Sequence, residues 1–323
     1  MQQLNCCGSV FFISPSGITF PLGTVIPTIY GVTVMKFNIN SAYGHGTHVY
    51  DDAEIRRYAP SVFTTVSHNR TSSRYVSVPT IDVVNTLRDH NWVVTKVLES
   101  GVRNPSRIGF SRHMVRFRRS HELEKNGTAI VGDTVPELVL LNAHDGSSSY
   151  TMHLGLYRYS CSNGMIVADS TVEKQSYRHT GDVIDHVIEG TYRIIEGIPE
   201  TLDRIEQFRS TQLNTHEALL FGKAAIPLRW KADEQTGIYP VSCDQVISVN
   251  RDADQPNNLW TILNRAQENI LRGGMATRAR NKRTGKLDRG RDARAILSVS
   301  ENVRLNKALW VLADEFDKLK AAA

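Results

Sequence analysis

The chain has 323 residues, of which 41% are hydrophobic and 22% are charged. This is ordinary globular composition, so it excludes collagen-like, coiled-coil and wholly disordered chains. Lys and Arg number 38 against 33 Asp and Glu, which gives a formal charge of +5. The net charge of a protein affects which partners it attracts rather than how it folds. The positions of the excess Lys and Arg residues along the chain therefore matter. The four cysteines include no C-x-x-C pair, which argues against a zinc or redox site and favours a reducing cytoplasm.

The first 34 residues differ from the rest of the chain, because they are apolar and are interrupted by Gly and Pro. They lack the basic residues that begin a secretory signal, and the interruptions argue against a membrane-spanning helix. We interpret residues 1–34 as a leader or a wrongly assigned start, with translation beginning at Met35; an edge strand or flexible arm is the alternative. An α+β core domain then covers residues 35–230, and a helical carboxy-terminal region covers 231–323.

Residue patterns predict a short helix followed by strands. Thr80 is placed as the N-cap of a helix over 80–90, and residues 92–98 are β-branched and aromatic like a strand. Three further strands are predicted over 110–119, 135–142 and 149–160. Short turns join these three strands, which favours an antiparallel meander over parallel units with long crossovers.

Helical periods dominate the second half of the chain. An apolar stripe over 183–205 predicts a long helix that is kinked near Gly197 and continues toward Phe221. Further amphipathic helices are predicted over 259–271 and 298–319. The predicted fold is therefore α+β, with an antiparallel sheet of three or more strands, a long kinked helix and a helical, basic carboxy-terminal region.

The strongest chemical signal is a basic loop at residues 272–294, where nine Lys and Arg stand against two Asp. Closely spaced cations of this kind suit phosphate, because each neutralised phosphate releases condensed counterions. A solvated linker that keeps the protein soluble is the alternative interpretation. The residues predicted to contact nucleic acid here are Arg272, Arg278, Arg280, Lys282, Arg283, Lys286, Arg289 and Arg291.

A second group of arginines lies earlier in the chain. Side-chain alternation puts Arg112, Arg116 and Arg118 on one face of the strand over 110–119. Arginines beside Phe110 and Phe117 resemble the mixture of cations and aromatic rings that holds single strands. A sheet face paired with nearby acids is the alternative. The nucleic-acid contacts predicted here are Arg103, Arg107, Arg112, Arg116 and Arg118.

Catalytic signals are weaker. A set of polar residues at helical spacing is a candidate site for Mg²⁺, although acids in a first helical turn also simply oppose the helix dipole. This set comprises Asp182, Asp185, His186 and Glu189. His144 and Asp145 could act as a general base and the carboxylate that orients it. The Asp145-Gly146 pair is also typical of an ordinary turn. No phosphate-binding glycine loop, serine-hydrolase motif or zinc-protease motif is present, so we expect no metal and no cofactor.

A family resemblance is carried by the run VPELVLLNAHDGSSSYTMHLGLYRYSCSNGM, with FSRHMVRFR before it and RHTGDV after it. These residues are similar to the phage and plasmid family known as domain of unknown function 932, and the likeness extends from Ala59 to Phe316. Membership implies a bacterial protein carried by mobile elements, beside recombination and antirestriction genes, and transfers no catalytic residue. The order of strands and long helix also resembles that of single-strand annealing recombinases, which hold DNA in a cationic groove as rings or filaments.

We therefore predict a non-enzymatic, cytoplasmic nucleic-acid-binding protein of a mobile element, without a membrane segment. Its partner is expected to be single-stranded DNA, which it would hold or anneal during recombination as a homo-oligomer. Two alternatives stay open: a metal-dependent nuclease that uses Asp182, Asp185 and Glu189 with Mg²⁺, and an antirestriction factor that binds an acidic protein. The main prediction requires both arginine groups to form one continuous track for a polyanion.

Overall fold

The computed structural model describes residues 48–71, 75–102, 104–120, 123, 134–158, 161–167, 175–177, 182–281 and 283–322. The predictions for the segment before Met35, for Arg103 and for Lys282 fall outside these residues. The compact unit that contains the described residues runs from Asn40 to Ala323. The division into folding units near residue 230 stays a prediction.

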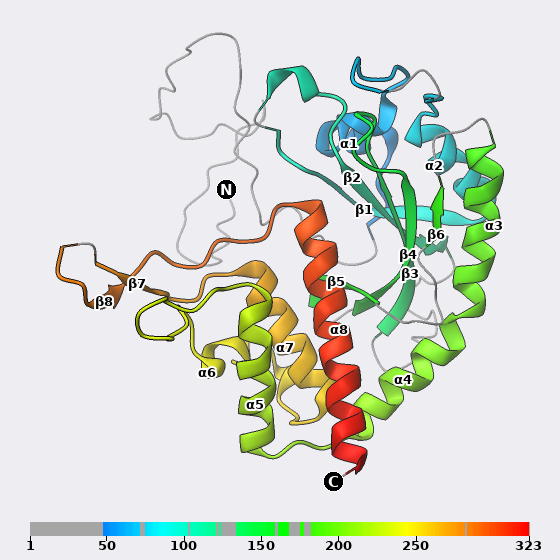
Figure 1. Cartoon of the computed structure of the whole chain (residues 1–323). Helices are drawn as coiled ribbons and strands as arrows, with labels where there is room; N and C mark the ends of the chain where they lie inside the picture. The colour runs from blue at the N-terminus through cyan, green and yellow to red at the C-terminus, as the bar shows by residue number, and fades with distance from the viewer. Residues whose placement is uncertain are drawn as a thin grey trace, which may run out of the picture. The chain divides into compact units, whose positions relative to one another are not determined.

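An antiparallel sheet of six strands forms the centre of the described fold (Figure 1). Its strands are β1 (Trp92–Glu99), β2 (His113–Arg119), β3 (Thr134–Asn142), β4 (Tyr150–Arg158), β5 (Cys161–Ile166) and β6 (Gln175–Tyr177). The first five strands pair in chain order, and β6 pairs with the start of β4. The predicted antiparallel meander is confirmed, with two more strands than the pattern indicated.

The two faces of the sheet carry different side chains. On one face, Val115 and Phe117 join the main hydrophobic core, which also contains apolar residues of helices α2 (Thr80–Asp89) and α3 (Val183–Glu196). The other face carries Met114 and Val139, which form a smaller cluster with Val299 of α8 (Val299–Ala322). Every residue of β3 and β4 is buried, so neither face of the sheet centre is open to solvent.

The predicted long helix is broken where the sequence indicated. Helix α3 ends at Gly197, and α4 (Ile198–Ser210) begins directly after it with proline in its first turn. Proline cannot donate a backbone hydrogen bond and its ring crowds the preceding turn, which explains the kink. The helical segment does not continue unbroken toward Phe221, because α5 (Thr215–Ala225) begins separately at a capping box on Asn214.

The centre of the carboxy-terminal region is α7 (Leu259–Arg272), whose residues from Leu259 to Leu271 are all buried. It packs against α4, α5 and α8 and against the short helix α6 (Cys243–Val246). Its apolar residues belong to the same core as those of the sheet. None of the described helices combines the length and apolar character that a bilayer span needs.

One short helix and one N-cap differ from the predictions. Helix α1 (Asp52–Tyr58) begins at a capping box formed by Asp51 and Glu54, within a stretch whose polar composition did not indicate a helix. Pro79 rather than Thr80 is the N-cap of α2, and Thr80 is the first helical residue. The Thr80 hydroxyl has another role, because it lies inside the protein rather than on the helix end.

A buried polar cluster around Thr80 joins α2 to the sheet. The Thr80 hydroxyl oxygen lies 2.8 Å from Nε2 of His113, 3.2 Å from Nε2 of His144 and 3.0 Å from Nδ2 of Asn142. All four residues are fully buried. His144 thus contacts Thr80, whereas Asp145 lies 3.7 Å from the Arg107 guanidinium, so the two neighbours do not form a base with its carboxylate.

Replacing Thr80 by the isosteric valine tests this cluster. We expect Thr80→Val to lower the free energy of unfolding by about 2–4 kcal/mol in urea denaturation, because it removes the shared hydrogen-bond partner of several buried polar groups. Thr86→Val is the matched control in the same helix, since the Thr86 hydroxyl donates only to the backbone oxygen of Asp82. Equal losses in the two variants would contradict the role given to Thr80.

Candidate nucleic-acid interface

The predicted basic loop at 272–294 begins with the last residue of α7, and the described residues after Gly273 form a two-stranded antiparallel ribbon. Strands β7 (Arg278–Arg280) and β8 (Leu287–Arg289) pair at its centre. The pairing continues on both sides: the Gly274 amide donates to the Ala293 oxygen (2.7 Å), and the Asn281 amide donates to the Lys286 oxygen (2.8 Å). We call residues 274–293 the basic ribbon. Each of its strands runs about eight residues, which at ~3.3 Å per residue makes an arm about 25 Å long.

Glycine determines how the ribbon leaves α7. Gly273 ends the helix with a φ of 72°, a left-handed conformation that favours glycine. A Cβ atom at this position would lie 2.4 Å from the backbone oxygen of Ala293, so the returning strand also excludes a side chain. The ribbon extends away from the end of α7, as the orange segment of Figure 1 shows.

Contacts from the 229–240 segment hold the ribbon at its base and along β7. The Arg229 guanidinium donates to the backbone oxygens of Ile270 and Arg294, which joins the end of α7 to the returning strand. The Arg280 Nε atom donates to Asp233 at 3.0 Å. This hydrogen bond from Arg280 holds the pKa of Asp233 well below its ordinary value. Arg280 is therefore an anchor of the ribbon rather than a free cation.

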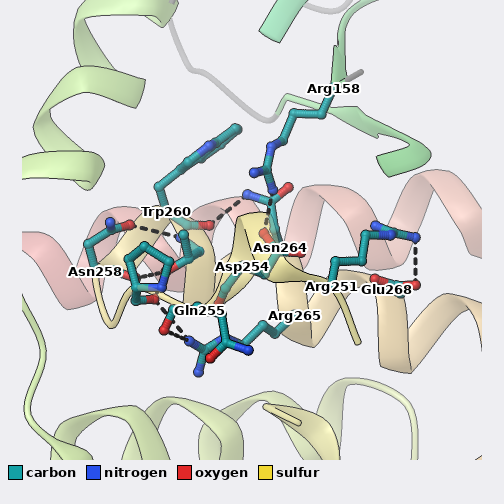
Figure 2. Close-up of polar contacts among 11 residues, drawn as sticks. Arg158, Arg251, Asp254, Gln255, Asn258, Trp260, Asn264, Arg265 and Glu268 are labelled. Atoms are coloured by element: carbon teal, nitrogen blue, oxygen red, sulfur yellow. Dashed lines mark hydrogen bonds and ion pairs between the residues drawn. The ribbon is translucent and has the colours of Figure 1, made fainter. Parts of the chain in front are cut away.

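Buried ion pairs hold the helix from which the ribbon begins (Figure 2). Arg158 of β4 reaches Asp254 in the loop before α7, with 2.6 Å between Nη1 and Oδ1. The Arg265 side chain donates to the backbone oxygens of Asp254 (2.7 Å) and Gln255 (2.9 Å). These contacts tie α7 to its preceding loop and to the sheet, so the ribbon starts from a fixed support.

Arg272 at the end of α7 belongs to this support and not to the exposed ribbon. Its Nη1 atom lies 2.5 Å from Oε1 of Glu268, and Arg251 contacts the same oxygen at 2.6 Å. The Glu268 side chain is only 3% exposed. A buried carboxylate needs such partners because removing one leaves an uncompensated charge. The predicted phosphate contact at Arg272 is therefore not supported by its position.

Five cations of the ribbon remain accessible. Arg278, Arg283, Lys286 and Arg291 are exposed, and none of them forms an ion pair with a described carboxylate. Arg289 is 79% exposed and has only a 3.7 Å contact with Asp292. Arg278 and Arg289 lie directly opposite each other in the pairing of β7 with β8. Like charges placed opposite one another destabilise a ribbon, and a bound polyanion would relieve that repulsion.

The arginines of β2 are not part of an exposed face, which corrects the prediction for Arg116 and Arg118. These side chains are 3% and 2% exposed. Both approach Glu137 of β3, with 2.6 Å from Arg116 Nε and 3.2 Å from Arg118 Nε to its carboxylate oxygens. The Arg118 guanidinium also lies 4.0 Å above the centre of the Tyr157 ring. The alternation that placed both arginines on one side was right, but that side faces the interior.

The Arg116 guanidinium extends across neighbouring strands toward β5. It donates to the backbone oxygens of Gly164 and Met165, at 2.8 Å in each case. A Cβ atom at Gly164 would lie 2.2 Å from Arg116 Cζ, and one at Gly155 would lie 2.8 Å from Nη2. Glycine in the HLGL and CSNGM runs therefore makes room for one buried arginine. The sequence signal for this site is Glu137, the single acid inside an apolar strand.

The other two described arginines of the first group, Arg107 and Arg112, also have local contacts. Arg107 faces Asp145, and Arg112 donates to the backbone oxygen of Ser147 at 2.8 Å. Of the aromatic residues expected beside them, Phe117 is fully buried and Phe110 packs its ring edge against His68. Figure 1 places β7 and β8 well apart from β2. The two arginine groups thus do not form one continuous track.

The candidate metal ligands at the start of α3 are exposed, and two of them have other contacts. Glu189 pairs with Arg193 at 2.5 Å, and the His186 ring stacks on Tyr177 with 5.7 Å between centroids. Within the described part of the chain, no group of three or more His, Cys, Asp or Glu side chains is arranged to hold a metal ion. The geometry therefore gives no support to the nuclease alternative built on Asp182 and Asp185.

Comparison with known proteins shows the family. Residues 67–310 match the model of the family described as "Domain of unknown function (DUF932)". The chain is 35% identical over 261 residues to UPF0380 protein YafZ and to UPF0380 protein YfjQ, both of Escherichia coli K12. Each match covers 81% of this chain and 89% of the relative. The protein thus belongs to the DUF932 family. No solved structure matches the chain, so the similarity to annealing recombinases gains no support.

The buried ion cluster can be tested with one conservative substitution. We expect Glu137→Gln to lower the free energy of unfolding by about 3–5 kcal/mol, because two buried arginines lose their carboxylate. Glu189→Gln is the control, since its pair with Arg193 is 57% exposed on both sides and should contribute at most about 1 kcal/mol. Urea denaturation of both variants measures the difference. A loss at Glu137 no larger than that at Glu189 would refute the cluster.

Proposed function

We propose that this protein binds nucleic acid through phosphate contacts made by the basic ribbon. The observation that carries the proposal is the position of Arg278 directly opposite Arg289 on an exposed pair of strands. Folding alone disfavours this arrangement because the two guanidinium groups repel each other. A phosphate between or beside them converts that repulsion into charge-assisted hydrogen bonds.

The rest of the ribbon supports the same partner. Its tip adds Arg283 and Lys286, and the returning strand adds Arg291. Arg229 holds the ribbon at its base and Arg280 holds the far end of β7, so less conformational entropy is lost when the exposed cations bind. A pre-formed arm with unpaired cations at intervals is suited to a chain of phosphates rather than to a single small anion.

The described geometry favours binding to the backbone over stacking on bases. Residues 272–294 contain no aromatic residue, and Phe117, which was expected to stack on single strands, is inside the core. A two-stranded ribbon can enter the major groove of duplex DNA, which is about 12 Å wide, or follow its phosphates. We therefore propose that duplex DNA binds at least as tightly as single-stranded DNA. Annealing in recombination, a homo-oligomer, a mobile-element origin and a cytoplasmic location stay predictions.

A salt titration tests the role of the ribbon. We expect the slope of log K against log salt for a duplex to fall by about three to four units when four ribbon cations are neutralised, because each phosphate contact contributes about 0.9. Fluorescence anisotropy with labelled duplex and single-stranded DNA gives the slopes. The variant carries Gln at the exposed ribbon positions Arg278, Arg283, Lys286 and Arg289.

The matched control changes the same net charge elsewhere on the surface. It carries Gln at the exposed cations Arg56, Arg57, Arg70 and Lys223. We expect its salt slope to stay within about one unit of that of the unmodified protein, since scattered cations contact few phosphates. Equal falls in both variants would show diffuse attraction without a ribbon site. Absence of DNA binding at low salt would refute the proposed function itself.

A further inference from the structure

A cavity of about 250 Å³ lies on the described fold apart from the ribbon. The end of α2 with the turn after it, the start of β1, the end of β2 and one side of α3 form its walls. The turn depends on Asn91, which has a φ of 64° and whose backbone oxygen accepts from the Ser120 amide at 3.0 Å. Trp92 then pairs directly with Arg119 across the two strands.

Arg119 differs from the other arginines of β2. Arg116 and Arg118 share a carboxylate, whereas Arg119 forms no ion pair with any described carboxylate. Its guanidinium lies 5.1 Å from the centre of the Trp92 ring, and that ring is 4% exposed. A buried ring beneath the guanidinium restricts its motion through a cation–π contact. The cavity therefore contains a positioned cation that lacks a described counter-ion.

One side of α3 supplies an apolar floor and an aromatic wall. Ile188, Tyr192 and Ile195 line the cavity at a spacing that places them on one helix face. Leu87 of α2 also lines the cavity, and Tyr192 is 52% exposed. An apolar cavity of about 150 Å³ holds a benzene ring, so this volume accommodates a substituted planar ring. A half-exposed tyrosine beside it offers a face for stacking.

Two polar side chains of the cavity wall narrow the choice of ligand. Asp89 provides a hydrogen-bond acceptor, and the Asn91 amide provides both a donor and an acceptor. The edge of a nucleobase carries both donors and acceptors that match such a pair, whereas the ring edge of a simple aromatic acid carries neither. Asp89 also adds a negative charge near the single arginine, which disfavours a di- or triphosphate relative to a monophosphate.

We propose that this cavity binds a nucleoside monophosphate unit. The base lies against Tyr192 and Ile188 of α3, and the phosphate contacts the Arg119 guanidinium. A free nucleotide and the phosphorylated end of a nucleic-acid strand both carry this combination of a base and a terminal phosphate. The site does not depend on the basic ribbon, because no ribbon residue lines the cavity.

Calorimetric titration of the full chain tests the site. The probes are the four common nucleoside 5′-monophosphates, adenosine, ATP, inorganic phosphate and benzoate. We expect at least one monophosphate to bind about tenfold or more tightly than adenosine, because a guanidinium–phosphate contact is charge-assisted. ATP should bind more weakly than AMP. Benzoate binding as tightly as the best monophosphate would overturn the nucleotide assignment, and so would a failure of every monophosphate to bind at millimolar concentration.

Single substitutions test whether the monophosphate binds in this cavity. Arg119→Gln should reduce monophosphate affinity to the level of adenosine, and Tyr192→Ala should weaken both ligands. Arg193→Gln is the matched control, because Arg193 follows Tyr192 on α3 but does not line the cavity. Unfolding curves of each variant exclude loss of fold as the cause. Unchanged affinity in Arg119→Gln would overturn the proposal.

Two further titrations identify the source of the nucleotide and separate this site from the ribbon. In the four-fold ribbon variant, a short oligonucleotide with a 5′-phosphate that binds more tightly than its 5′-hydroxyl form and more tightly than AMP identifies a strand end as the ligand. Equal binding of the two oligonucleotides supports a free nucleotide. The four-fold ribbon variant should bind monophosphates normally, so failure of DNA binding by the ribbon leaves this result unaffected.

Discussion

The carboxylate of Glu137, placed between two buried arginines, is the interaction on which much of the sheet depends. Charges inside a protein are tolerated only where partners compensate for lost water. Glu137 serves Arg116 and Arg118 together, the Tyr157 ring lies under Arg118, and backbone oxygens of β5 accept from Arg116. The arrangement requires glycine on the two strands that the Arg116 guanidinium crosses. Glu137, Gly155 and Gly164, which lie in the run that carries the family resemblance, thus all contact or make room for one side chain.

Buried polar and charged side chains also need partners in the carboxy-terminal half of the chain. Helix α7 is surrounded by protein, yet it carries Arg265, Gln267, Glu268 and Asn269 at 5% exposure or less. Each finds partners on a different neighbour: Gln267 contacts Asn306 of α8 at 2.9 Å, and Asn269 donates to the backbone oxygen of Val246 at 3.0 Å. These directional contacts determine how the surrounding helices sit on α7. Because the basic ribbon begins at the end of this helix, they also determine the direction in which its cations point.

The arginines with structural roles differ from the candidate functional ones in whether the guanidinium has a partner within the fold. Arg116, Arg118, Arg158 and Arg265 are buried, with an acid or backbone oxygens as partners, and their substitution would act first on stability. Among the described residues, no such partner contacts Arg278 or Arg119. Arg289 has only a 3.7 Å contact with Asp292. A formal charge of +5 therefore understates the exposed positive charge at the ribbon. The two proposed sites use cations that folding leaves available.

The sequence by itself determined the α+β class, the order of the main strands, the break at Gly197 and both ends of α7. Those features follow from local patterns and caps, which act between residues close in the chain. Tertiary structure decided which arginines are accessible, because alternation assigns Arg116 to a side of its strand without saying what covers that side. Glu137 reaches Arg118 only through the register of β2 with β3. The basic segment is likewise held as a ribbon by distant residues, Arg229 at its base and Asp233 at the far end of β7, and no local pattern encodes such contacts.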